Sequence, residues 1–168
     1  SNMAFPVLVL LGSAGSGKGT QASLLQEQFG YHKVEAGALF RAKAQEDSPL
    51  GRRVKEINDR GGFSPDDLIA ELIDEELRRW SKDEPLLIDN YPATIGQAKL
   101  LEQSLASSGR KVEVFAIWVR VSRQEAARRL MNRSQCLVCK TVFMSRDIRA
   151  CPHCGGEVKV RTYDTPEA

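Results

Sequence analysis

A glycine-rich segment, GSAGSGKGT at residues 12–20, contains residue types that bind phosphate. Glycines let several backbone N–H groups point at one anion, and the lysine adds a mobile positive charge. The residues that would surround the phosphate are Gly12, Gly15, Ser16, Gly17, Lys18, Gly19 and Thr20. The strict pattern has Ser or Thr directly after the lysine, whereas here Gly19 precedes Thr20. An ordinary glycine turn is the alternative, but the apolar run before the segment and the helical pattern after it favour a nucleotide-phosphate site.

Four cysteines form two Cys-x-x-Cys pairs, Cys136 with Cys139 and Cys151 with Cys154, on either side of residues 140–150. Two such pairs can converge tetrahedrally on Zn²⁺, although this linker is shorter than common spacings. A redox disulfide is the alternative. Four protein ligands leave no position for water or substrate, so we expect a structural metal that folds a segment too small to have its own core.

Apolar segments alternate with amphipathic helical segments, a pattern typical of a parallel sheet covered by helices. We expect strands in FPVLVLLG, PLLIDN and VEVFAIWVRV, which are residues 5–12, 85–90 and 112–121. Asp89 ends the second strand, and ligands gather at the carboxyl ends of parallel strands. A capping aspartate is the alternative for Asp89. The predicted fold class is therefore α/β, with Asp89 at the edge where we expect ligands.

Capping residues indicate where helices begin and end. The helix after the glycine-rich segment can end at Gly30, and a further helix can start at Ser48, before a proline, and stop at residues 61–62. Ser64 is a candidate N-cap, with Pro65 at the first helical position of the next helix. A helix near residues 95–108 would follow the second strand.

A basic helix is predicted after the third strand. Ser122 and Glu125 have the spacing of a capping box, and the helix would run through about Arg133. Arg129 and Arg133 are four residues apart and would share one helix face, from which both could bind the same phosphate chain.

Overall composition narrows the classes of partner. The chain has 168 residues, with 24 basic and 22 acidic side chains and a net charge of +2. This length suits one domain with small insertions, and the charge balance gives no reason to expect nucleic acid or anionic membrane. A zinc-ribbon nucleic-acid binder is the weakest alternative. The longest apolar stretches are well short of the ~20 residues that cross a bilayer, and without a charged leader before them we expect a cytoplasmic protein that binds small molecules.

Several segments resemble those of adenylate kinases and related nucleoside monophosphate kinases. The glycine-rich loop contains Gly-Lys-Gly-Thr-Gln at residues 17–21. Further resemblance lies in EAGALFRA at 35–42, LLIDNYPATIGQA at 86–98 and RRLMNRS at 128–134. The four cysteines stand where zinc-binding lids of the family carry theirs.

This resemblance implies three parts and a reaction. The parts are a phosphate-loop core of residues 3–35 and 66–133, a helical insert for the acceptor nucleotide at 36–65, and a zinc-ribbon-like lid at 134–168. The implied reaction transfers the γ-phosphoryl group of ATP to a nucleoside monophosphate, with Mg²⁺ as cofactor and a structural Zn²⁺ in the lid. Such a reaction needs oriented oxygens and dispersed negative charge more than covalent chemistry.

The resemblance also implies roles for single residues of the core and insert. Lys18 matches the phosphate-loop lysine, and Asp89 matches the acidic residue that holds Mg²⁺ through water. Arg41 matches an arginine that binds the acceptor phosphate, in the segment that contains Gly37. Gln97 matches the residue that contacts the acceptor base.

Three arginines match positions in or near the lid of the family. Arg129 and Arg133 correspond to arginines at the lid entrance, where they would contact both nucleotides. Arg161, together with Asp164, corresponds to the pair that closes the lid over the substrates.

Five positions depart from the family pattern. Ala93 stands where the family has an acceptor-binding arginine, Ala36 and Ala38 replace a threonine and an aspartate, Ser134 replaces a lid arginine, and Asn90 replaces a glycine. Loss of one preorganised charge donor costs ~3–4 kcal/mol of transition-state stabilisation. The alternative to a kinase is therefore a nucleotide-binding module with little or no turnover.

The last residues, RTYDTPEA, resemble the end of the lid. The family continues from there with a further helix, strand and helix, so we expect the C-terminal part of the family fold to be absent from this chain. The strand at 112–121 would then have an uncovered neighbouring position, which further chain or a partner would fill.

Overall fold

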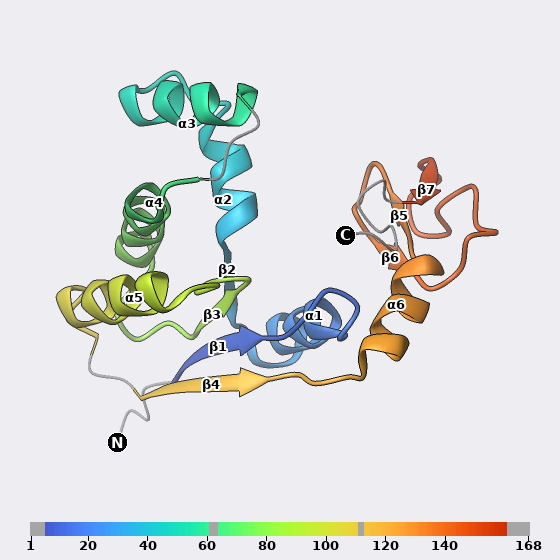
Figure 1. Ribbon diagram of the computed structural model, residues 1–168, viewed down its shortest axis with the longest axis horizontal. Helices are drawn as coiled ribbons and strands as arrows, with labels where there is room; N and C mark the ends of the chain where they lie inside the picture. The colour runs from blue at the N-terminus through green and yellow to red at the C-terminus, as the bar shows by residue number, and fades with distance from the viewer. Residues whose placement is uncertain (1–5, 61–63, 111–112, 161–168) are drawn as a thin grey trace. The chain divides into compact units, whose positions relative to one another are not determined.

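The computed structural model describes residues 6–60, 64–110 and 113–160 (Figure 1). Internal contacts divide the chain into two compact units. The first contains residues 1–12 and 19–118, and the second contains residues 13–18 and 119–168. Each unit has a sheet of its own.

Four parallel strands form the sheet of the first unit: β1 (Val7–Leu11), β2 (His32–Glu35), β3 (Leu86–Asp89) and β4 (Val114–Trp118). Their order is β2-β3-β1-β4, and every neighbouring pair is parallel. β1 and β3 occupy the middle of the sheet and are buried on both faces, which explains why their apolar residues do not alternate with polar ones. The predicted α/β fold class is confirmed.

Helices cover both faces of the central strands (Figure 1). The even-numbered residues of β1 pack with α1 (Lys18–Phe29). The odd-numbered residues pack with α4 (Asp66–Arg79) and α5 (Ile95–Ser107) on the other face. Because successive strand residues point to opposite faces, one strand contributes to both layers.

A small helical insert, α2 (Ala36–Lys43) and α3 (Pro49–Asp59), follows β2. Ser48 caps α3 as predicted, because its hydroxyl accepts a hydrogen bond from Gly51 N at 3.0 Å. Apolar residues of α2, α3 and α4 form a cluster of their own. α3 ends at Asp59, and the predicted stop at residues 61–62 lies outside the described residues.

The predicted start of α4 is wrong by one residue. Pro65, not Ser64, is the N-cap, and helical backbone begins at Asp66. Pro65 has a non-helical backbone (φ −57°, ψ 141°), and its carbonyl accepts the first helical hydrogen bond, from Ile69 N at 3.2 Å. Ser64 therefore lies one residue too early to cap the helix.

The predicted end of α6 (Arg123–Met131) is also wrong, since the helix stops before Arg133. Asn132 is the C-cap residue, and its side-chain Nδ2 donates to the carbonyl of Arg128 at 3.1 Å. Arg129 and Arg133 consequently do not share a helix face.

β4 is the outermost strand of the sheet. It pairs with β1 on one side, and no other described strand pairs with it. Its large apolar side chains are exposed on both faces, with exposed fractions of 49% for Phe115 and 66% for Trp118.

The second unit contains α6 and a small antiparallel sheet of β5 (Ser134–Cys136), β6 (Val142–Phe143) and β7 (Val158–Val160). The strand order is β6-β5-β7. The small core of this sheet includes Cys136 and Cys151.

The two longest apolar stretches of the sequence lie in β1 and β4 rather than in helices. Within residues 6–60, 64–110 and 113–160, no helix combines the length and the apolarity that crossing a bilayer requires.

Candidate functional site

The glycine-rich segment between β1 and α1 requires glycine at two positions. Gly15 (φ 78°) and Gly17 (φ 92°) have left-handed backbone conformations that side chains rarely adopt. A Cβ atom on Gly15 would also lie 2.6 Å from the carbonyl oxygen of Ala126 in α6. Ser16 is buried, and its N–H closes a turn by donating to the carbonyl of Ser13 at 3.1 Å. Residues 13–18, which belong to the same unit as α6, are thus tightly folded against this helix.

Arg129 of α6 lies beside this segment. Its Nη1 donates to the carbonyl of Ser16 at 3.4 Å, and its Nε donates to Glu125 Oε1 at 2.7 Å. Hydrogen bonds from Arg128 and then Arg129 lower the pKa of Glu125 to about 2. The carboxylate is therefore charged at neutral pH and holds the guanidinium of Arg129 near the loop. Two predicted site residues, Ser16 and Arg129, are brought together.

Glu125 has a different role from the one its spacing suggested. Ser122 does cap α6, since its hydroxyl accepts a hydrogen bond from Glu125 N at 3.1 Å. The Glu125 carboxylate, which a capping box would turn back to the N-cap, instead accepts hydrogen bonds from Arg128 and Arg129. The signal for this was present, because these arginines follow at the three- and four-residue spacings of helical ion pairs.

The remaining loop residues lie around the start of α1. Lys18 is the first residue of α1 and is buried. Gly12 directly follows β1, and Gly19 and Thr20 are exposed on the first turn of the helix. An added Cβ at Gly19 would meet nothing within 4 Å. The unpaired N–H groups and the dipole of a helix N-terminus favour an anion at this position.

Of the other predicted lid arginines, the structure describes Arg133. Arg133 is half-buried beyond the C-cap of α6. Arg161 and Asp164 lie outside the described residues. Ser134, at the position of a family arginine, is buried in β5 and donates to the carbonyl of Ser145 at 2.6 Å.

Asp89 forms a second candidate site at the carboxyl end of β3, where it is 2% exposed. In the sheet register it lies opposite Leu10 of β1 and Glu35 of β2. Lys33 Nζ lies 3.0 Å from Glu35 Oε2 and 3.3 Å from Asp89 Oδ2. Burial opposes the charge on Lys33, but hydrogen bonds and attraction from both carboxylates outweigh it and raise the pKa of this amine. One cation thus lies between two carboxylates.

These carboxylates fit the magnesium role implied for Asp89. Oxygen ligands are the type that Mg²⁺ prefers, and the Lys33 ammonium already takes the place of a cation between them. Neither Lys33 nor Glu35 was a predicted site residue. The alternation in HKVE indicates that their side chains share a face, but only the pairing of β2 with β3 brings them to Asp89.

Arg41 and Gly37 lie on α2, next to this carboxylate cluster. Arg41 Nη2 is 3.7 Å from Glu35 Oε1, and the side chain is 69% exposed. A Cβ on Gly37 would be 3.2 Å from Arg41 Nη1, so glycine leaves room for the guanidinium. Arg41 is therefore available at the surface for an anion.

Gln97 uses both ends of its amide within the protein. Its Oε1 accepts a hydrogen bond from Ala93 N at 2.7 Å, and its Nε2 donates to Asp66 Oδ1 at 2.8 Å. Gln97 is buried, and Thr94 caps α5 beside it. This network ties the β3–α5 connection to the start of α4.

Asn90 stands where the resemblance leads us to expect a glycine. Its φ is 60°, in the left-handed region, and asparagine is one of the few other residues that tolerate this conformation. The replacement thus preserves the backbone at the end of β3.

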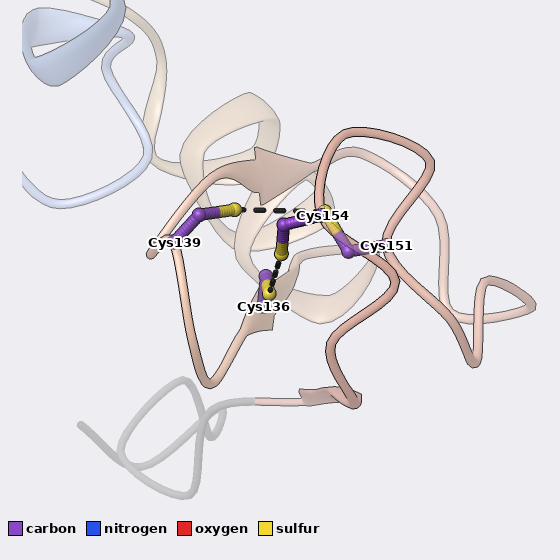
Figure 2. A group of neighbouring side chains, drawn as sticks. All are labelled: Cys136, Cys139, Cys151 and Cys154. Atoms are coloured by element: carbon purple, nitrogen blue, oxygen red, sulfur yellow. Dashed lines mark hydrogen bonds between the residues drawn. The ribbon is translucent and has the colours of Figure 1, made fainter.

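The four cysteines converge in the second unit, although they come from two separate turns (Figure 2). Their Sγ atoms all lie within 4.8 Å of one another, and all four are free thiols. Tetrahedral Zn–S bonds of about 2.3 Å place sulfurs about 3.8 Å apart, and the pairs Cys136–Cys154 and Cys139–Cys151 are each 3.5 Å apart. The cluster therefore fits a structural zinc ion.

Comparison with known proteins gives consistent results. A family model described as adenylate kinase matches residues 10–168. An adenylate kinase of Thermosipho melanesiensis is 36% identical over 165 residues, which are 95% of this chain and 77% of that relative. One of Syntrophomonas wolfei is 34% identical over 165 residues, covering 95% of this chain and 76% of the relative. One of Thermus thermophilus is 38% identical over 128 residues, covering 76% and 66%.

The family match extends over the phosphate-binding segment, the carboxylate cluster at the end of β3 and the four cysteines, and over nearly all of the chain between them. With relatives above 30% identity over 95% of its residues, the chain belongs to the adenylate kinase family.

Proposed function

We propose that this chain transfers the γ-phosphoryl group of ATP to a nucleoside monophosphate. The observation that carries the proposal is the tightly folded glycine-rich segment with Arg129 held at the carbonyl of Ser16. Relatives that match 95% of the chain are called adenylate kinases, which favours an enzyme over a binding module without turnover.

On the ATP side, the backbone N–H groups of residues 13–18 and the start of α1 would bind the phosphates. Lys18 would follow the transferred group as a mobile positive charge. Arg129 would disperse negative charge by exchanging the carbonyl of Ser16 for a phosphate oxygen. Glu125 keeps Arg129 within reach of the loop until then.

Asp89 is the residue that we propose to hold magnesium, with Glu35 beside it. Bound with ATP, Mg²⁺ neutralises charge on the phosphate oxygens. The contribution of the chain is to fix these carboxylate oxygens at the ends of two neighbouring strands.

On the acceptor side, we propose that exposed Arg41 binds the monophosphate and that Gln97 reads the base. Both ends of the Gln97 amide already form hydrogen bonds within the protein, so contact with the base requires the amide to give up one of these partners. The bond to Asp66 joins two helices and is the one available for exchange, because the bond to Ala93 N lies within the same connection. Arg133 and Arg161 are proposed to complete the site from the lid.

A coupled assay of nucleoside diphosphate formation, run with ATP and a panel of monophosphates, tests this function. We expect turnover with at least one acceptor, and we expect Lys18→Ala to reduce it by at least ~100-fold, the usual effect of losing one charge donor. Lys99→Ala, at an exposed position of α5, is the control and should retain full activity. Tight ATP binding without turnover on any acceptor would instead indicate the nucleotide-binding module.

A further inference from the structure

We propose that Lys33 is a positioning residue of the magnesium site: its ammonium group holds Asp89 and Glu35 together and competes with the metal for them. The inference rests on the proposed function only in taking Asp89 as the metal-binding carboxylate. It assigns a role to Lys33, which the reaction described so far does not use.

The geometry follows from strand pairing. β2 and β3 run parallel in a register that places Glu35 opposite Asp89. Lys33 lies two residues before Glu35, so both side chains project from the same face of the sheet. The ammonium is 3.0 Å from one carboxylate and 3.3 Å from the other. It therefore bridges two strands at the edge where the metal is expected.

The cluster is sheltered from solvent, which makes its charges effective. The side chains of Lys33, Glu35 and Asp89 are 22%, 26% and 2% exposed. Exposed ion pairs are strongly screened, whereas partly buried pairs are screened much less. A cation that binds Asp89 must displace this ammonium or tolerate its repulsion.

The net charge of Lys33, Glu35 and Asp89 suggests how this cluster controls metal binding. Two carboxylates and one ammonium leave one net negative charge, and Arg41, 3.7 Å from Glu35, offsets part of it. This cluster attracts a divalent ion less than two free carboxylates would. The phosphates of a bound nucleotide add the negative charge that the cluster lacks, and the flexible lysine stem allows the ammonium to move aside. Lys33 thus makes metal binding depend on the nucleotide.

Binding of Mn²⁺, a paramagnetic probe for the magnesium site, tests this inference without any turnover. The zinc-loaded full chain is titrated without nucleotide, and free Mn²⁺ is measured by electron paramagnetic resonance. We expect Lys33→Met to tighten Mn²⁺ binding at least about fivefold, because a repelling charge within a few ångströms is gone. Lys33→Arg keeps the charge and should bind like the wild type. Asp89→Asn in the Lys33→Met background should abolish the gain.

Two further variants keep the test decisive. Lys99→Met removes an exposed lysine of α5 and should leave Mn²⁺ affinity unchanged. Glu35→Gln leaves the ammonium to Asp89 alone and should weaken Mn²⁺ binding at least about threefold. If circular dichroism shows that Lys33→Met does not fold, the Glu35→Gln result decides.

Several results would overturn the inference: equal Mn²⁺ affinity in the wild type and Lys33→Met, a gain that survives Asp89→Asn, or tighter binding in Glu35→Gln. These outcomes are separate from failure of the kinase assay. A chain without turnover that still shows the expected affinity changes would retain the role of Lys33 and lose the proposed reaction.

Discussion

Charged side chains near the proposed sites form hydrogen bonds and ion pairs with one another. Glu125 accepts hydrogen bonds from Arg128 and Arg129, and Lys33 lies between Glu35 and Asp89. An exposed pair such as Glu125 with Arg128 contributes little to stability. Glu125 instead affects the position of Arg129, because the hydrogen bond between them limits where the guanidinium can lie. Ligand binding at either site must exchange such an internal partner for a phosphate or a metal ion.

A single hydroxyl group leads to a prediction about stability. Tyr91 is 1% exposed in the main core, and its hydroxyl has no hydrogen-bond partner among the described residues. Burial, with repulsion from Asp66 and Asp74, raises its pKa to about 12. Because a buried hydroxyl without a partner costs free energy, Tyr91→Phe should raise the free energy of unfolding by ~1 kcal/mol. Urea denaturation measures this, and a loss of stability would show that the hydroxyl is satisfied.

Among the elements, α6 both shapes the phosphate-binding segment and supplies the arginine beside it. The carbonyl of Ala126 lies where a side chain of Gly15 would be, and Arg129 follows one turn later. The identity of a loop residue is thus set by a helix more than a hundred residues away in sequence. Packing against α6, in addition to phosphate binding, explains the glycine.

Gly15→Ala tests this packing. The new Cβ would meet backbone, which cannot rotate away, and the φ of 78° disfavours alanine. We expect a loss of at least ~1–2 kcal/mol in the free energy of unfolding, measured without nucleotide. Gly19→Ala is the matched variant, since its Cβ meets nothing within 4 Å and it lies in helix α1, where alanine is favoured. Equal losses in both variants would contradict the role of α6.

At the scale of the whole molecule, the two units differ in the interactions that stabilise each of them. The first buries apolar residues of its strands and helices in extended clusters. The small sheet of the second has a core of Cys136, Cys151 and Val158. A core in which cysteines make up so much of the buried surface depends on what binds the thiols.

Metal content and metal removal test this difference. We propose that the protein binds about one Zn²⁺ per chain, measurable by elemental analysis. Chelation, or Cys154→Ser, should remove hydrogen-exchange protection from residues 134–160 while β1 and β3 remain protected, since ~10–16 kcal/mol of binding free energy is available to such sites. Unchanged protection in the second unit after zinc removal would contradict a structural metal.

How much could be predicted depended on whether a feature was local. Apolar runs identified β1 and β3, Ser48 and Ser122 were recognised as N-caps, and the cysteine pairs indicated a metal site. Helix ends were less predictable: Pro65 displaced the start of α4, and Asn132 ended α6 before Arg133. A helix ends where the backbone angles change, and several neighbouring residues can adopt the required angles, so the sequence does not fix which of them does.

By itself, the sequence determined the alternation of strands and helices, the loop that feeds α1, and the family to which the chain belongs, because these depend on residue types and short spacings. Only the tertiary structure decided that Lys33 and Glu35 meet Asp89, that Arg129 lies beside Ser16, and that the amide of Gln97 donates to Asp66. The physical reason is that strand order, register and helix packing join residues far apart in the chain. The spacing of neighbouring residues does not determine which strands will pair.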